Sequence, residues 1–333
     1  MTNTSLNRCS TDRALFRHLS HRQCERLHQA SLEILARTGV KLHYSDAVDL
    51  LADAGASVED GNRVRVPADL VERALETVPK SISMFDRLGR PAMHLEGDRC
   101  YYGPGSDCLN IIDHRTGEHR KAVLQDVVDA AVVCDALPNV DFVMSMFLPS
   151  DTDAGISDLL QMEAMVNHTT KPIVFVTNDF PNCVRVVEMA EAVAGGNRAL
   201  EEKPFCACYI NVTTGLRHNE EALQKLLFLA EKGVPALYIP IMIAGMTGPV
   251  TMAGSMAALN AGVLTGLVLS QLKRPGAPFV VPGCGLTMLD MKTMINPCST
   301  EMMSTGTLAA PCICTAPARK TPNNREEIGR AHV

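Results

Sequence analysis

The sequence predicts an α/β fold in which a parallel sheet closes into a (β/α) barrel behind a small, mainly helical N-terminal extension. Two observations predict it. From about residue 96 onward, strand-like apolar runs alternate with runs of helical periodicity. The strand-like runs are apolar along nearly their whole length, which is typical of parallel strands covered on both faces.

The N-terminal extension, residues 1–95, is predicted to contain two helices. The first begins at Ser20, which can form a capping box with Gln23, and ends at Gly39. Its expected apolar face consists of Leu27, Ala30, Ile34 and Leu35. The second follows Pro67 and has apolar residues at helical spacing, namely Leu70, Val71, Ala74, Leu75 and Val78. Short strand-like segments are expected at 62–67 and 81–88.

The barrel elements follow in order. A strand with a Gly-rich end is expected at 100–113, and a turn and return at 114–122. Strands are then expected at 140–149, 171–178, 205–212, 234–243 and 277–283. Helices are expected at 124–138, 157–169, 180–196, 219–233 and about 250–272.

One stretch, residues 236–272, contains no Asp, Glu, Lys, Arg or His, so a membrane span is the alternative to a buried element. Pro240, Gly245, Gly248 and Pro249 interrupt it, which predicts a strand, a Gly-rich turn and a helix dense in small residues. The turn falls where the carboxyl-terminal face of a barrel would be, and that face holds active sites.

Composition limits the class of protein. The 333 residues carry a formal net charge of -6 and no basic run, which argues against nucleic acid as a partner. The N-terminus has no apolar signal region, so a cytoplasmic protein is expected. The 12 cysteines are scattered, and Cys134, Cys206 and Cys208 lie in apolar runs, so most should be reduced thiols in the core.

Four spaced blocks of sequence carry a resemblance: GPGSDCLNIIDHRTGEHRKA, ALPNVDFVMSM, IAGMTGPVTMAGSMAALNAGVLTGLVLSQLKRPGAPFV and LTMLDMKTM. In order and spacing they resemble the trimethylamine methyltransferase family, over roughly Leu19 to Met303. The resemblance implies a TIM (β/α)8-type barrel that moves a methyl group from a methylated amine, such as trimethylamine or glycine betaine, to the Co(I) of a separate corrinoid protein. Founding members carry pyrrolysine, whereas many relatives lack it and act on quaternary amines such as glycine betaine. This chain shows no unusual residue, and the region where one would be expected is not represented.

The C-terminus departs from the family pattern. Residues 304–333 have neither strand nor helix periodicity, and IGRAHV is what translated sequencing-adapter read-through would give. We therefore expect a barrel domain over 96–303 that is incomplete at its C-terminus by about two of eight units, followed by a non-native or frame-shifted tail. Exposed sheet edges in such a fragment would favour inactivity or aggregation.

The chemistry that the resemblance implies sets the expected lining of the site. A quaternary ammonium leaves as a neutral amine, so the protein has to orient it and exclude water. Because positive charge disappears in the transition state, aromatic faces and modest dipoles suit the site better than a carboxylate touching the nitrogen. Aromatic candidates at strand ends are Tyr101, Tyr102, Phe147, Tyr209 and Tyr238, each of which could instead be a core residue.

Polar and glycine candidates complete the expected site. Asp107 is the candidate catalytic residue, with a turn-capping role as the alternative. Asn178 and Asn211 follow buried strands and could hold a substrate carboxylate or the corrinoid surface, or tie a loop to its own backbone. Gly245 and Gly248 could let the backbone approach a ligand, or form a tight turn.

No metal or tightly bound cofactor is predicted in the chain itself. Cys206, Cys208 and Cys284 could form a zinc site, but no nearby His completes the set. The GPG at 103–105 falls short of a dinucleotide-binding motif. The expected partners are a corrinoid protein and a small methylated amine, without nucleic acid or membrane, in a possible homo-oligomer. The alternative function is a non-catalytic barrel that binds a methylated amine.

Overall fold

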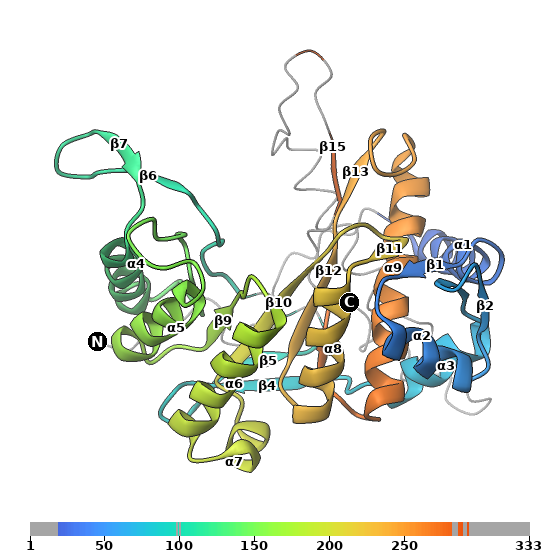
Figure 1. Ribbon diagram of the computed structural model, residues 1–333, viewed down its shortest axis with the longest axis horizontal. Coiled ribbons are helices and arrows are strands. Elements are labelled where there is room, and N and C mark those ends of the chain that lie inside the picture. Colours follow the sequence, from blue (N-terminus) through green and yellow to red (C-terminus); the bar gives the residue numbers. More distant parts are fainter. Residues whose placement is uncertain (1–18, 98, 100, 282–285, 289–291, 293–333) are drawn as a thin grey trace. The chain divides into compact units, whose positions relative to one another are not determined.

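The computed structural model describes residues 19–97, 99, 101–281, 286–288 and 292 (Figure 1). These fall into two compact units. Among the described residues, the first unit contains 80–209 and 232–235, and the second contains 19–79, 210–231 and the residues from 236 onward. Strand β10 begins in the first unit and ends in the second.

The first unit contains three strands of a parallel sheet, with β9 hydrogen-bonded between β8 and β10. Two antiparallel hairpins, β4–β5 and β6–β7, accompany them. The strands are β4 (Ile82–Phe85), β5 (Pro91–Leu95), β6 (Asn110–Ile112), β7 (His119–Lys121), β8 (Val143–Met144), β9 (Ile173–Phe175) and β10 (Cys206–Val212). The helices are α4 (Leu124–Ala136), α5 (Ser157–His168), α6 (Phe180–Ala194) and α7 (Asn197–Glu202).

The second unit has a small sheet of order β11-β1-β3-β2 and the parallel pairs β12–β14 and β13–β15. Its strands are β1 (Val40–Leu42), β2 (Ser57–Glu59), β3 (Arg63–Arg65), β11 (Arg217–His218), β12 (Ala236–Pro240), β13 (Met242–Ala244), β14 (Phe279–Val280) and β15 (Leu286–Met288). Its helices are α1 (His21–Arg37), α2 (Ser45–Asp53), α3 (Ala68–Thr77), α8 (Glu220–Lys232) and α9 (Met252–Lys273).

The predicted α/β class with a parallel sheet is confirmed. The sheet that contains β10 has the strand order β14-β12-β10-β9-β8, and helices alternate with these strands along the chain. Closure of the sheet into a barrel stays a prediction, as does the division into domains at 1–95, 96–303 and 304–333. Residues 304–333 lie outside the described residues.

The first predicted barrel strand, 100–113, is wrong. Residues 101–107 form no regular element, and β6 instead pairs antiparallel with β7. The Asp113 side chain explains the turn, because it accepts hydrogen bonds from the backbone N–H groups of Arg115 and Thr116. Within the predicted strand, one isolated parallel bridge is present, between Cys108 and Phe147. The helices α2 and α7, both short, were not predicted.

The first helix begins as predicted but buries a different face. Ser20 and Gln23 form the capping box. The buried residues are His28, Ser31, Leu32 and Leu35, so Leu35 was predicted correctly while Leu27, Ala30 and Ile34 are only half-buried. The second helix, α3, buries Leu70, Val71, Ala74 and Leu75 as expected.

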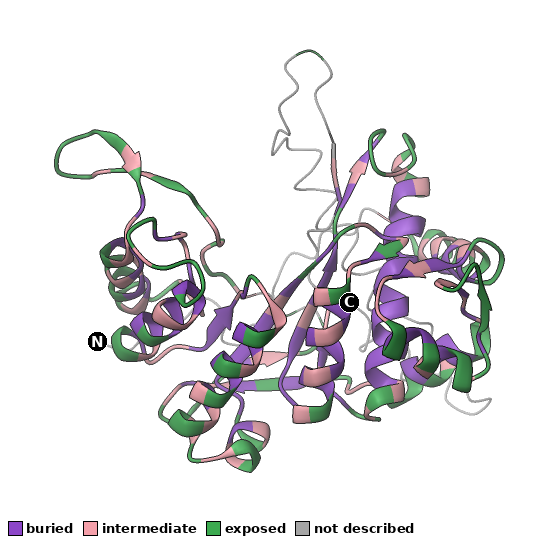
Figure 2. Ribbon diagram, in the orientation of Figure 1, coloured by how far each residue is buried: buried purple, intermediate pink, exposed green. Residues whose placement is uncertain are grey.

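Helix α9 follows the predicted strand and turn, and its apolar surface is covered by protein. Among the described residues it is the one helix long and apolar enough to cross a membrane, and 83% of its most apolar window is buried. Within the second unit it packs against α1, α2, α3, β12 and β13, and Figure 2 shows most of its length as buried. Its composition is therefore explained by burial in the fold.

The face that α1 buries includes a polar contact with α9. Ser31 Oγ lies 2.9 Å from the carbonyl oxygen of Ala257 and accepts a hydrogen bond of 3.0 Å from Asn260 Nδ2. Both side chains are buried. Their hydrogen bonds satisfy these polar groups, so Ser31 is buried on the same face as Leu32 and Leu35.

We expect Ser31→Ala to destabilise the protein by about 1 to 2 kcal/mol, because it leaves the buried Asn260 amide without its partner. The double variant Ser31→Ala/Asn260→Leu should recover most of that loss, since replacing both polar partners by apolar groups is nearly neutral. Urea unfolding of the three proteins measures both effects. A double variant as unstable as the single one would contradict this account.

Candidate functional site

Polar side chains, all of them buried except that of Asn178, gather where β8 and β9 end in the first unit. Ser145 follows β8, Asn178 follows β9, and the first turns of α5 and α6 supply the rest. In α/β proteins, ligands bind beyond the carboxyl ends of parallel strands. We call this group the β8–β9 polar cluster: Ser145, Ser157, Asp158, Gln161, Asn178 and Asn182.

One half of the cluster joins the end of β8 to α5. Ser145 Oγ contacts both Gln161 Oε1 and the carbonyl oxygen of Phe147. Gln161 Nε2 donates to Ser157 Oγ at 3.0 Å. Because Ser145, Ser157 and Gln161 are all buried, their mutual hydrogen bonds satisfy groups that would otherwise be costly to remove from water.

The other half joins α5 to the end of β9. The Asp158 carboxylate, in a residue only 5% exposed, accepts from the backbone N of Asn178 at 2.8 Å and from its side-chain Nδ2 at 3.1 Å. It also accepts from Asn182 Nδ2 at 3.3 Å. Asp179, between the two asparagines, caps α6 by accepting from the backbone N of Asn182. The loop after β9 is therefore held at several points.

Asp107 lies beside this cluster. Its backbone N donates to the carbonyl oxygen of Ser145 at 3.3 Å, and its Oδ2 accepts from Ser106 Oγ at 2.7 Å. Its φ of +64° is a left-handed conformation that few non-glycine residues adopt, although aspartate tolerates it better than most. Phe147, largely buried, borders the cluster through its carbonyl oxygen, which lies 3.2 Å from Ser145 Oγ.

Three of the predicted site residues therefore contact the polar cluster at different members: Asp107 and Phe147 contact Ser145, and Asn178 contacts Asp158. The other candidates of the first unit have different neighbours. The Tyr101 hydroxyl donates to the carbonyl oxygen of His94 and accepts from its backbone N, which ties the ring to β5. Tyr102 is 67% exposed, and Tyr209 is half-buried on β10.

The four candidates of the second unit occupy separate environments. Asn211 is exposed at the end of β10. Gly245 has a φ of +80° in an exposed turn, a conformation that favours glycine. A Cβ at Gly248 would lie 2.3 Å from the sulfur of Met242, so a larger residue there would require the Met242 side chain to move.

Tyr238 is a core residue of the second unit. It is 0% exposed, its ring lies 5.9 Å from that of Phe279, and its hydroxyl lies 2.6 Å from His218 Nδ1. His218 Nε2 faces the carbonyl oxygen of Gly215, so the ring donates there and accepts from the tyrosine. Burial raises the pKa of the Tyr238 hydroxyl well above its usual range.

Five members of the cluster, Ser145, Ser157, Asp158, Gln161 and Asn182, were not predicted from the sequence. A signal was present in α5, where Ser157, Asp158 and Gln161 stand at helical spacing beside the buried Met162 and Met165. Polar residues on the buried face of an amphipathic helix call for partners in the tertiary structure. The partners themselves lie in other elements, at 145, 178 and 182.

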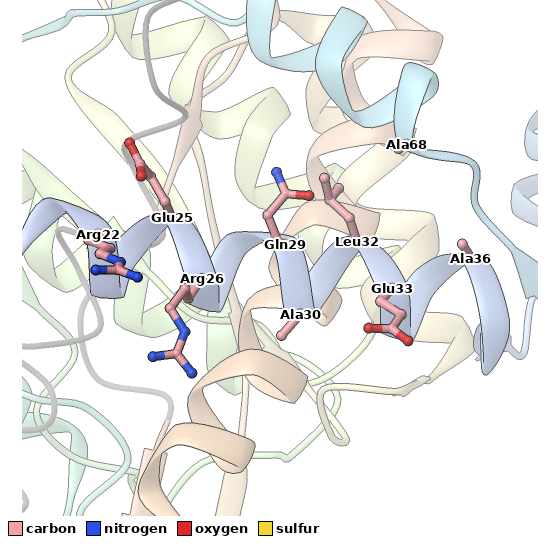
Figure 3. A pocket seen from close by; sticks show the side chains of 9 residues that line it. All are labelled: Arg22, Glu25, Arg26, Gln29, Ala30, Leu32, Glu33, Ala36 and Ala68. Atoms are coloured by element: carbon pink, nitrogen blue, oxygen red, sulfur yellow. The ribbon is translucent and has the colours of Figure 1, made fainter.

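A surface depression of about 770 Å³ lies along α1 in the second unit (Figure 3). Charged and small apolar residues share its lining, and none of the predicted site residues contributes to it: Arg22, Glu25, Arg26, Gln29, Ala30, Leu32, Glu33, Ala36 and Ala68. Figure 3 shows all of these side chains on α1 except that of Ala68, which lies at the start of α3. Because the charged residues of the lining are all exposed, the depression has the character of a solvated surface.

The described residues include no group of three or more His, Cys, Asp or Glu arranged to hold a metal ion. Cys206 and Cys208 are both fully buried on β10, and Cys284 lies outside the described residues. Burial raises the pKa of the Cys206 thiol to about 12, which disfavours the thiolate that zinc requires. That zinc is not bound stays a prediction.

Thiol labelling of the native protein tests whether Cys206 is buried and unreactive. At pH 8 we expect iodoacetamide to alkylate Cys108, which is exposed, at least tenfold faster than Cys206, which is buried with a raised pKa. Peptide mass spectrometry over a time course measures both rates. Equal labelling in the folded protein, followed by equal labelling in urea, would contradict the buried placement of β10.

Comparison with known proteins places the chain in a family. The family described as "Trimethylamine methyltransferase (MTTB)" matches residues 2–301. Trimethylamine methyltransferase MttB of Desulfitobacterium hafniense is 32% identical over 272 residues, which cover 81% of this chain and 55% of that protein. Glycine betaine methyltransferase of Desulfitobacterium hafniense is 28% identical, with coverages of 83% and 57%.

Proline betaine:corrinoid methyltransferase of Eubacterium limosum is 28% identical, with coverages of 84% and 58%. A crystal structure of the hydroxylamine MtmB complex aligns with a TM-score of 0.48 and 10% identity, over 78% of this chain and 52% of that one. The chain spans a little over half the length of these curated relatives. Because the family match extends over most of the sequence, the chain belongs to the trimethylamine methyltransferase family.

Proposed function

We propose that this protein transfers a methyl group from a methylated amine to the Co(I) of a corrinoid protein. The observation that carries the proposal is the family match over residues 2–301. Relatives named for trimethylamine, glycine betaine and proline betaine support an amine substrate, and the one named for corrinoid supports the acceptor. Quaternary amines are the substrates that the proposal favours.

We propose that the β8–β9 polar cluster presents Asn178, its exposed member, to the substrate, with Asp107 and Phe147 beside the cluster. Support comes from its position at the carboxyl ends of two parallel strands. A neutral amide such as that of Asn178 orients an ammonium group without the strong ground-state attraction of a carboxylate in contact with it. Asp107 would orient substrate from its strained turn, with its carboxylate moderated by the Ser106 hydroxyl.

The other predicted residues, Tyr101, Tyr102, Tyr209, Asn211, Tyr238, Gly245 and Gly248, stay hypotheses as substrate contacts. Among them Tyr102 and Asn211 are exposed, whereas Tyr238 has no exposed surface to offer a cation. We propose that the corrinoid is carried by a partner protein, where it would accept the methyl group. Cytoplasmic location and a possible homo-oligomer are parts of the same proposal.

The test combines transfer and binding. The protein is incubated with a reduced corrinoid protein and, separately, trimethylamine, glycine betaine and proline betaine, while methyl-Co(III) absorbance is followed. Appearance of the methylated corrinoid with any one amine is the expected result. Calorimetric binding of an amine without transfer to corrinoid would replace the proposal by a non-catalytic methylated-amine binding protein, and neither binding nor transfer would contradict both.

A further inference from the structure

The orientation of the Asn178 side chain is set by a buried neighbour. Its Nδ2 donates to Asp158 Oδ1, while its backbone N donates to Asp158 Oδ2. A carboxylate can only accept hydrogen bonds, so the nitrogen end of the amide must face it. The amide oxygen consequently lies on the opposite side from Asp158, in a residue that is exposed at the end of β9.

Asp158 is itself held firmly enough to impose this orientation. It lies in the first turn of α5, is buried, and receives a further hydrogen bond from Asn182 Nδ2 in α6. Two bonds to one residue, through backbone and side chain, leave Asn178 little freedom to rotate its amide. A reversed amide would place its oxygen against the carboxylate, which is repulsive in a buried site.

We infer that Asp158 is a positioning residue that turns the Asn178 side-chain oxygen toward the ammonium group of a methylated amine. The inference rests on the proposed function for its choice of ligand. The outward oxygen carries a partial negative charge that attracts a cation, whereas the full charge of Asp158 stays behind the asparagine. That is the modest attraction required when positive charge disappears during the reaction. It also makes Asn178 a poor partner for a substrate carboxylate.

The first test is Asp158→Asn, which keeps the volume and can still accept from the backbone N of Asn178. Its amide nitrogen now requires an acceptor, so the Asn178 amide should reverse and present N–H groups outward. We expect calorimetric affinity for tetramethylammonium, a cation without a carboxylate, to fall about tenfold, because a dipole favourable to charge is replaced by an unfavourable one.

The exchange variant Asp158→Asn/Asn178→Asp provides the rescue. The new amide at 158 donates to the carboxylate at 178, so an oxygen again points outward, now with a full charge. We expect tetramethylammonium affinity to return to the original value or above it. In methyl transfer the exchange variant should show a low KM with a reduced kcat, because the ground state is stabilised more than the transition state.

Asp135→Asn is the matched control. Asp135 is a part-buried carboxylate that also accepts from a side chain and a backbone N, those of Thr169 and Thr170, but the residues that it holds precede β9, whereas Asp158 holds Asn178 after β9. Its replacement should reduce thermal stability without changing cation affinity. A loss of affinity equal to that of Asp158→Asn would show that the effect is general destabilisation, and would overturn the inference.

Further outcomes separate this inference from the proposed function. If Asp158→Asn does not fold, Asn178→Ala removes the oxygen at an exposed position, and unchanged tetramethylammonium affinity in that variant would overturn the inference. Methyl transfer by the original protein with unchanged affinity in Asp158→Asn would also overturn it while leaving the proposed function intact. Cation binding that depends on Asp158, without methyl transfer, would support the inference and contradict the proposed function.

Discussion

Replacing Gly262 by alanine is expected to destabilise the protein by about 2 to 3 kcal/mol, the cost of overpacking a close-packed core. A Cβ at this position in α9 would lie 2.2 Å from the carbonyl oxygen of Gly215 and 2.8 Å from its carbonyl carbon. These are backbone atoms, which cannot rotate aside as a side chain can. The close approach of α9 to the segment before β11 therefore requires a residue without a Cβ.

The sign of this effect is informative. In the interior of a helix, alanine normally stabilises relative to glycine by about 0.5 to 1 kcal/mol, so local propensity alone predicts the opposite result. Urea unfolding of the original protein and Gly262→Ala measures the difference. Gly105→Ala is the control, because a Cβ there meets nothing within 4 Å. A higher midpoint for Gly262→Ala would show that the two segments are not in close contact.

Acid is expected to destabilise the second unit by up to about 3 kcal/mol through His218 alone. Burial lowers the pKa of this histidine from 6.5 to about 4. Between these values the unfolded chain binds a proton that the folded chain does not, so stability increases with pH there. The contribution is complete above about pH 6.5, decreases as the pH falls toward 4, and is lost below that.

The variant His218→Gln tests this prediction, since glutamine can accept from the Tyr238 hydroxyl but does not titrate. The free energy of unfolding, measured in urea at intervals from pH 4 to pH 7.5, should have a shallower pH dependence in the variant. His119→Gln is the control, because His119 is exposed on β7 and its replacement should leave the slope unchanged. Identical slopes in all three proteins would be evidence against a buried neutral His218.

By itself, the sequence determined the local elements and the family. Ser20 and Gln23 define the start of α1, and Pro240, Gly245 and Gly248 divide the uncharged run before α9. The alternation of apolar strands and helices gave the parallel sheet, because burial on both faces leaves a continuous apolar run. These features depend on residues that lie close together in the chain, so the order of apolar, polar, Gly and Pro residues within one segment is enough to predict them.

Tertiary structure alone decided which side chains meet. Asn260 bonds to Ser31 across 229 positions, and Asn178 bonds to Asp158 across 20. The sequence predicted the turn and return at 114–122, but it did not show that residues 101–107 form no strand while β6 pairs only with β7. The periodicity of a segment predicts which face of its helix or strand a side chain occupies. The partner of that side chain depends on how separate elements pack together. That packing results from the combined burial of many groups, so the sequence of one segment does not reveal it.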